Sequence, residues 1–363
     1  MDTHPEIARE LETVDRRSRE LLADLSDEQL RVPYERGINP PIWELGHSAF
    51  FYEYFLLRKH GNQTARMPGY DEVWDSFEIM HKHRWTPGVV PDRATMLDYY
   101  SRVMDETRGR LDVLELDSYE HYLFRYVIHH QQMHLESLIW ARQTLGYPAP
   151  AFSDHPQPSP GSPGESGDAA ISGGEYFIGM PDGVPGEAGH PFSFDNERPG
   201  FRIELPPFKI SKTLVSNREF LEFVNDGAYQ NPALWNFGGQ CWLGEGGSRD
   251  LPAYWRLRQD GSPQVRKFET WIDLPLDAPA LHLSVWEAEA FCRWAGRRLP
   301  TEPEWEAAAR GPEALPFPWG KEVKTSCLDM DGTLYGTAPA TAFAEGASPT
   351  GCLQMLGTAW EWT

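Results

Sequence analysis

The sequence lacks the segments that would take a protein into or across a membrane. No apolar run approaches the length that a bilayer-spanning helix needs. The opening stretch, MDTHPE, is polar and acidic, without the basic start and apolar core of a signal peptide. These absences argue against a membrane protein or a secreted one, and we expect a cytoplasmic location.

Basic residues are also in short supply. The chain has 33 Lys and Arg against 54 Asp and Glu, which gives a formal net charge of −21. Such a chain repels a phosphate backbone at long range, and no basic tail offsets the repulsion. We therefore expect no nucleic-acid partner.

Cysteine is scarce, and no two cysteines form a CxxC pair. In a reducing cytosol, widely spaced cysteines are most simply free thiols. A disulfide framework or a cysteine-based zinc site is the less favoured interpretation. The cysteines are Cys241, Cys292, Cys327 and Cys352.

Aromatic residues, by contrast, are abundant, with 14 Trp, 14 Tyr and 18 Phe. At 363 residues, 40% of them apolar, the chain is too long for one ordinary core and predicts two domains. The aromatic content indicates large cores and well-filled loops. The alternative is an aromatic-walled pocket for a quaternary ammonium group. Composition leaves both interpretations open.

The first domain, residues 1–150, is predicted to be an α-helical four-helix bundle. Apolar residues recur there at near-helical spacing, and Pro40 and Pro41 open the second helix, because proline suits the first helical turn. A turn-rich stretch, residues 61–91, follows that helix. Bundles build metal sites from side chains on facing helices. The expected helices span residues 7–25, 42–58, 92–114 and 118–145.

The chain changes character after the bundle. Residues 151–172 are rich in Pro, Ser and Gly and are predicted to be a linker. Residues 173–363 are punctuated by Gly, Pro and Trp and predict an α+β domain with long loops over a small sheet. Helices are expected there only at residues 216–226, 284–295 and 301–309.

The sharpest local signal is HHQQMHLES, residues 129–137, on the fourth helix. His130 and His134 are four residues apart, so both imidazoles project from one helical face and can share a metal. His129 lies about 100° away around the helix and is expected in the core or beside a ligand. Glu136 points nearly opposite to His134, so we expect it to support a ligand or to serve in packing rather than to bind the metal.

A third ligand is expected from the second helix. His47 follows WELG among apolar residues that should face the core. Alone, it would be read as a core histidine; opposite an HxxxH pair, it becomes the leading candidate. Three neutral imidazoles leave open positions, as facial iron sites do, and zinc also accepts three histidines. The ligand set itself does not decide the metal.

The chain resembles a family of two-domain enzymes. The bundle, with His47 and the pattern of His130, His134 and Glu136, resembles the DinB-like domain of ergothioneine-type sulfoxide synthases. The second domain resembles the formylglycine-generating-enzyme (sulfatase-modifying factor) fold, which is related to C-type lectins. The segments that carry this second resemblance are GGEYFIGM, FDNERP, SNREFLEFVNDGAY, WAGRRLPTEPEWEAAAR, FPWG and MLGTAWEWT.

The resemblance implies an enzyme of the ergothioneine and selenoneine synthase family. Such enzymes use Fe(II) and O2 to join sulfur or selenium to the imidazole C2 of hercynine (trimethylhistidine). Met133 stands where ergothioneine enzymes of the mycobacterial type have a substrate-contacting glutamine. Together with NPPIWELGH, WDSF and RQTLGYPAP, it favours the selenoneine branch, whose partners are hercynine and a selenosugar. Arg84 is a candidate contact for an anionic cosubstrate, and the alternative for Arg84 is a plain surface arginine.

Three alternatives remain open at this point. The first is a sulfoxide synthase that uses cysteine or γ-glutamylcysteine. The second is a DinB-like thiol transferase with zinc or nickel, which would leave the second domain without a task. The third is a non-catalytic binding module, against which the three histidines argue. Family members also continue beyond the WEWT motif, so we expect the second domain to be truncated at Thr363, with substrate-binding residues missing.

Overall fold

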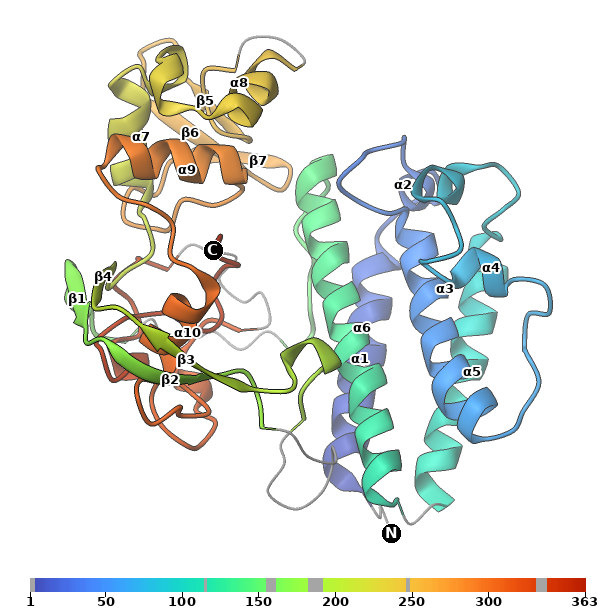
Figure 1. Ribbon diagram of the computed structural model, residues 1–363. Helices are drawn as coiled ribbons and strands as arrows, with labels where there is room; N and C mark the ends of the chain where they lie inside the picture. The colour runs from blue at the N-terminus through green and yellow to red at the C-terminus, as the bar shows by residue number, and fades with distance from the viewer. Residues whose placement is uncertain (1–3, 114–115, 155–160, 182–191, 246–248, 331–337) are drawn as a thin grey trace. The chain divides into compact units, whose positions relative to one another are not determined.

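The computed structural model describes residues 4–113, 116–154, 161–181, 192–245, 249–330 and 338–363 (Figure 1). The chain divides into two compact units. Unit 1 comprises Met1–Asp154 with Pro181–Arg198, and unit 2 comprises His155–Met180 with Pro199–Thr363. None of the helices in these described ranges combines the length and the apolar character that crossing a membrane requires.

Unit 1 is the predicted helical bundle. Its long helices lie side by side, with α3 packed against α5 and α6, and α1 packed against α6 (Figure 1). The predicted helices agree with the observed ones to within a few residues. The long elements are α1 (Pro5–Ala23), α3 (Pro41–Tyr52) with its π-helical continuation η1 (Glu53–His60), α5 (Arg93–Val113) and α6 (Ser118–Leu145).

The ends of α6 follow from local sequence. The Asp117 side chain accepts a hydrogen bond from the backbone N–H of Glu120, and the Glu120 side chain accepts one from the backbone N–H of Asp117. Gly146, with φ 68°, ends the helix in the left-handed region that glycine tolerates. The helix therefore begins and ends where its residues predict.

Short helices occupy the predicted turn-rich stretch and also a segment between the first two long helices for which the sequence predicted no element. The element α4 brings Trp74 into the core, where its side chain is only 1% exposed. Burial of such a large apolar ring offsets the cost of ordering the loop that carries it. These short elements are α2 (Asp27–Arg31), α4 (Asp71–Trp74) and the 3-10 helix η2 (His81–Trp85).

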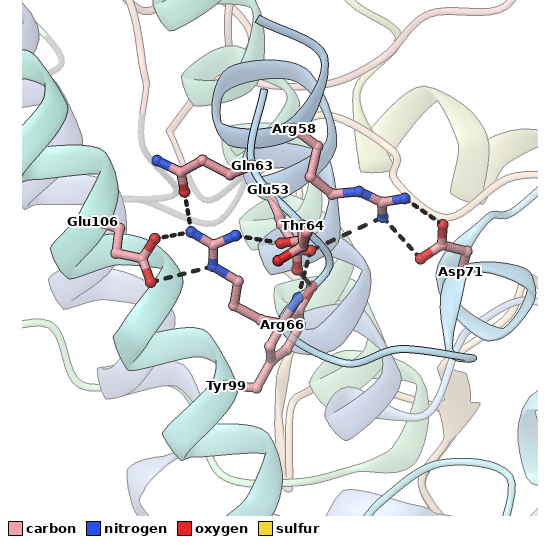
Figure 2. A network of polar contacts seen from close by, with 8 residues as sticks. All are labelled: Glu53, Arg58, Gln63, Thr64, Arg66, Asp71, Tyr99 and Glu106. Atoms are coloured by element: carbon pink, nitrogen blue, oxygen red, sulfur yellow. Dashed lines mark hydrogen bonds and ion pairs between the residues drawn. The ribbon is translucent and has the colours of Figure 1, made fainter. Parts of the chain in front are cut away.

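A polar network fastens the loop between η1 and α4 to the bundle (Figure 2). The Glu53 carboxylate is 1% exposed and accepts hydrogen bonds from the Tyr99 hydroxyl at 2.6 Å and from the Arg66 backbone N–H at 2.9 Å. Arg58 forms an ion pair at 2.7 Å with Asp71, which is the first residue of α4. A buried carboxylate needs such donors, and here they hold the loop that ends in Trp74.

Residues 192–198 belong to unit 1, although the sequence placed them in the second domain. The Phe192 ring lies 4.5 Å from the His129 ring and 5.4 Å from the Tyr122 ring, both on α6. Phe194 lies 5.9 Å from Tyr126 on the same helix. Aromatic packing therefore draws this stretch onto the bundle.

Unit 2 is an α+β assembly of small antiparallel sheets. Strand β1 (Asp168–Ile171) pairs with β4 (Phe208–Ser211), and β2 (Gly174–Ile178) pairs with β3 (Phe201–Leu205). A further sheet has the order β5-β6-β7, formed by Trp255–Leu257, Pro263–Lys267 and Thr270–Asp273. Strand β1 lies within the predicted linker, because pairing with β4 and burial of Ala169 and Ile171 stabilise a segment that composition alone leaves open.

The predicted helices of unit 2 are present as α7 (Asn217–Asn225), α9 (Val285–Trp294) and α10 (Glu302–Arg310). Each begins with a capping box. The side chain of Ser216, Ser284 or Thr301 accepts from a backbone N–H of the first turn, and the glutamate three residues later accepts from the backbone N–H of the capping residue. Helix α8 (Phe237–Gly244) was not predicted. The four cysteines form no disulfide with one another. Shorter 3-10 helices are η3 (Asp195–Glu197, in unit 1), η4 (Ala228–Gln230), η5 (Pro232–Leu234), η6 (Thr325–Cys327) and η7 (Ala344–Gly346).

Candidate metal centre

Three histidines converge between α3 and α6. One ring nitrogen each of His47, His130 and His134 lies within 4.8 Å of the other two. The Nε2 atoms of His130 and His134 are 3.2 Å apart. The His47 ring centroid lies 4.7 Å from that of His134 and 5.1 Å from that of His130. The residues that the sequence singled out as a ligand set are thus brought together.

His47 is held in one orientation from two sides. Its side chain is 5% exposed, and its Nδ1 donates a hydrogen bond to the backbone carbonyl of Trp74 at 2.5 Å. The indole of Trp43 stacks on its ring at 4.8 Å, with 11° between the planes. Because Nδ1 is engaged, Nε2 is the atom left to bind a metal.

His134 is oriented by a buried carboxylate. Its Nδ1 hydrogen-bonds the Glu44 side chain, which is 1% exposed. The Oε1 atom of Glu44 accepts further hydrogen bonds from Ser137 Oγ at 2.7 Å and from Asn39 Nδ2 at 2.8 Å. Burial raises the pKa of Glu44, but the hydrogen bonds from His134, Ser137 and Asn39 outweigh it and lower the pKa. Glu44 is therefore held as a carboxylate.

His130 is oriented by packing. Its ring stacks on Phe51 with the centroids 3.5 Å apart and the planes at 10°. Its Nδ1 is buried and finds no hydrogen-bond partner in the part of the chain that the structure describes. Its Nε2 faces His134. Stacking on Phe51 thus orients the His130 ring, whereas hydrogen bonds orient the rings of His47 and His134.

Burial keeps these imidazoles uncharged. Desolvation, followed by the nearby His134, lowers the pKa of His47 to about 4. The same two causes, with His47 as a third, lower the pKa of His130 well below its ordinary value. Only the neutral imidazole has a lone pair to give to a metal, so these two rings are ready ligands at neutral pH.

The donor set fits a divalent transition metal. Metal–nitrogen bonds of about 2.1 Å place neighbouring imidazole nitrogens of one site roughly 3.0–3.4 Å apart, and the His130–His134 nitrogen distance of 3.2 Å falls in this range. A hydrogen-bond partner on the second ring nitrogen is typical of metal-binding histidines, and His47 and His134 both have one. Three imidazoles suit iron, zinc or nickel, so the geometry leaves the metal open.

Of the other predicted residues, three lie on α6 and one lies on η2. Met133 precedes His134 on α6 and is 52% exposed. Glu136 is half-buried on α6, and its supporting role stays a prediction. Arg84, on η2, lies with its guanidinium carbon 3.9 Å from the Trp43 ring centroid. His129 hydrogen-bonds Gln132 at 2.8 Å and is not part of the cluster.

Sequence reasoning missed Glu44 as the carboxylate behind His134. A signal was present: Glu44 is the acidic residue three positions before His47, in an otherwise apolar helix start, so it shares a helical face with that ligand. The role of Trp74 could not be predicted in this way, because its backbone carbonyl orients His47 and every residue type has such a carbonyl. Phe51 follows His47 by four residues, which places it next to the site by the same periodicity.

Fold and site together define a two-domain protein with a three-histidine centre in its helical bundle. Comparison with known families agrees: residues 10–140 match the DinB superfamily, and residues 157–363 match the sulfatase-modifying factor enzyme 1-like domain. The bundle is thus of the DinB type, and the second domain is of the formylglycine-generating-enzyme type, as the motifs predicted.

Relatives that match along nearly the whole chain identify the family. The hercynine oxygenase of Mycolicibacterium thermoresistibile is 32% identical over 99% of this chain and 79% of the relative. That of Mycolicibacterium smegmatis is 34% identical over 94% of this chain and 79% of the relative. A formylglycine-generating enzyme from Thermomonospora curvata is 32% identical over 54% of this chain and 70% of that protein. The chain belongs to the hercynine oxygenase family and is an oxygenase-type enzyme.

Proposed function

We propose that this enzyme is a non-haem Fe(II), O2-dependent oxygenase that forms a C–Se or C–S bond at the imidazole C2 of hercynine. The observation that carries the proposal is the convergence of the His47, His130 and His134 ring nitrogens within 4.8 Å. The printed names of the relatives supply the substrate class. The donor favoured by the sequence pattern around Met133 is a selenosugar, and the location we propose is the cytoplasm.

The ligands and the groups that orient them have separate roles in this proposal. An Fe(II) ion held by the three histidines would supply electrons to O2 and leave open positions for small ligands. The Trp74 carbonyl and Glu44 keep His47 and His134 in the tautomers that present Nε2. Phe51 covers the His130 ring and excludes water from it.

Arg84 and Met133 are the proposed substrate contacts. Arg84 Nη1 donates to Asn39 Oδ1, whereas its Nε is buried and has no partner among the described residues. We propose that this donor pairs with an anionic group of the cosubstrate. Met133, exposed and next to His134, offers an apolar, polarisable surface where a glutamine would offer hydrogen bonds. We propose that Glu136 stands behind a ligand or packs on α6, and that it does not bind the metal.

A sulfoxide synthase that uses cysteine or γ-glutamylcysteine is the second candidate. It is favoured by the match to three mycobacterial hercynine oxygenases along nearly the whole chain. Both candidates share the metal, O2 and hercynine, and differ only in the chalcogen donor.

The decisive experiment separates metal, reaction and donor. The chelator-treated protein is loaded with Fe(II) without oxygen, and O2 uptake is then followed with hercynine and either a selenosugar, cysteine or γ-glutamylcysteine. Mass spectrometry of the product identifies the new bond. Replacement of His47, His130 or His134 by alanine should abolish metal binding and turnover, whereas His129→Ala, one residue from a ligand, should retain both. Zinc-supported transfer without O2 uptake would contradict the proposal.

A further inference from the structure

The guanidinium of Arg84 contacts both Asn39 and Trp43, and each of these residues begins a chain of contacts that ends at a histidine of the metal centre. Its Nη1 donates to Asn39 Oδ1 at 2.6 Å, and its carbon lies 3.9 Å from the Trp43 ring centroid. Its Nη2 donates to the backbone carbonyl of Ser76 at 3.4 Å. Arg84 is half-buried, so its cation is partly removed from water, and its hydrogen bonds are stronger than they would be in water.

The first set of contacts leads to His134. Arginine can only donate hydrogen bonds, so it fixes the Asn39 amide with its oxygen toward Arg84 and its nitrogen toward Glu44. Asn39 Nδ2 donates to Glu44 Oε1 at 2.8 Å, and Glu44 accepts from His134 Nδ1. The amide is thus in the one orientation that satisfies a donor on one side and a carboxylate on the other.

The second set leads to His47. The Trp43 ring, which Arg84 contacts by a cation–π interaction, stacks on His47 at 4.8 Å. Trp43 Nε1 donates to the Val73 carbonyl at 2.8 Å, one residue before the carbonyl that accepts from His47. The planar guanidinium suits a stacked aromatic partner better than an ammonium group does.

We propose that Arg84 is a positioning residue for the metal centre, joined to His134 through Asn39 and Glu44 and to His47 through Trp43. It thereby sets the orientation of ligands from both α3 and α6 without touching the metal. The inference rests on the proposed metal-dependent function. It predicts that loss of Arg84 changes how the ion is held, beyond any effect on folding.

The test uses Co(II) bound to the chelator-treated full-length chain, because the visible spectrum of Co(II) reports the arrangement of its ligands. For Arg84→Met we expect a shifted spectrum and Co(II) affinity lowered by about 10–100-fold, as for other groups that orient metal ligands. Arg84→Lys should restore part of the affinity through Asn39, but not the spectrum, since lysine cannot stack as a plane. Asn39→Ala combined with Arg84→Met should lower affinity by less than the product of the two single effects, because both act on His134 in series.

Arg93→Met is the matched control. Arg93 lies in the same unit and donates to the backbone carbonyls of Leu25 and Leu22. These hydrogen bonds do not involve the three histidines. The Arg93→Met substitution should lower thermal stability but leave the Co(II) spectrum the same as in the wild type. An unchanged spectrum and affinity in Arg84→Met, or changes no larger than those in Arg93→Met, would overturn the inference while leaving the metal centre intact. Failure of the wild type to bind Co(II) or Fe(II) would overturn the proposed function as well.

Discussion

Gly46 lies directly against the indole of Trp74: a Cβ built on Gly46 would come within 2.6 Å of Trp74 Cζ3. The same position would also be 2.7 Å from the Met96 side chain. Gly46 precedes the ligand His47, and Trp74 provides the carbonyl that orients this ligand. The absence of one side chain therefore lets α4 pack onto α3 and complete the surroundings of His47.

Gly46→Ala should therefore weaken both folding and metal binding. The added methyl group must displace a fully buried ring, which costs about 1–3 kcal/mol of unfolding free energy, and the shift moves the Trp74 carbonyl away from His47. Urea unfolding and Fe(II) titration measure the two effects. Gly109→Ala in α5 is the control: its Cβ would meet no atom within 4 Å, so it should gain about 0.5–1 kcal/mol from helix propensity. Equal stability of the two variants would contradict the packing argument.

Glu44, rather than Glu136, should control His134. Glu44→Gln keeps the shape but removes the carboxylate that accepts from His134, and we expect metal affinity to fall by about 10–100-fold. Glu136→Gln, on the same helix as His134, should change affinity by less than about threefold. Competition against a chromophoric chelator measures both. A larger loss in Glu136→Gln than in Glu44→Gln would reverse the assignment.

The metal-free protein should lose stability on acidification through His47. Its folded-state pKa is lowered from 6.5 to about 4, so between these values the unfolded chain binds a proton that the folded chain does not. Stability then falls as the pH falls. From pH 7 to pH 5 this histidine should contribute a loss of about 2 kcal/mol, at about 1.4 kcal/mol for each unit below its unfolded pKa. Urea unfolding of chelator-treated wild type and His47→Gln should show the smaller loss in the variant, whereas parallel losses would refute the argument.

The network around Glu53 should stabilise the bundle more than an exposed ion pair does. Glu53→Gln removes a buried negative acceptor from Tyr99 and the Arg66 backbone, at a cost of about 1.5–3 kcal/mol. Asp98→Asn, which breaks the exposed Arg102–Asp98 pair on α5, should cost less than about 1 kcal/mol. Hydrogen exchange of residues 61–74 should rise only in Glu53→Gln. Equal exchange in both variants would show that the network does not hold this loop.

Local order was predictable because its causes lie close together in the chain. Apolar spacing placed the long helices. The helix starts at Asp117, Ser216, Ser284 and Thr301 are likewise local, because each cap reaches only three residues along the chain. Strand β1 escaped prediction because its stability comes from pairing with β4, about forty residues later. Helix α4 escaped because the burial of Trp74 is a tertiary effect.

By itself, the sequence determined that His130 and His134 share a helical face, since a four-residue spacing and the helical repeat leave no other outcome. It also pointed to His47 through its apolar surroundings. Only the tertiary structure decided which groups orient these rings: the Glu44 carboxylate, the Trp74 carbonyl and the Phe51 ring. The reason is physical. A helix places its own side chains, but a hydrogen bond or a stacked ring across helices exists only once packing has brought distant segments within a few ångströms.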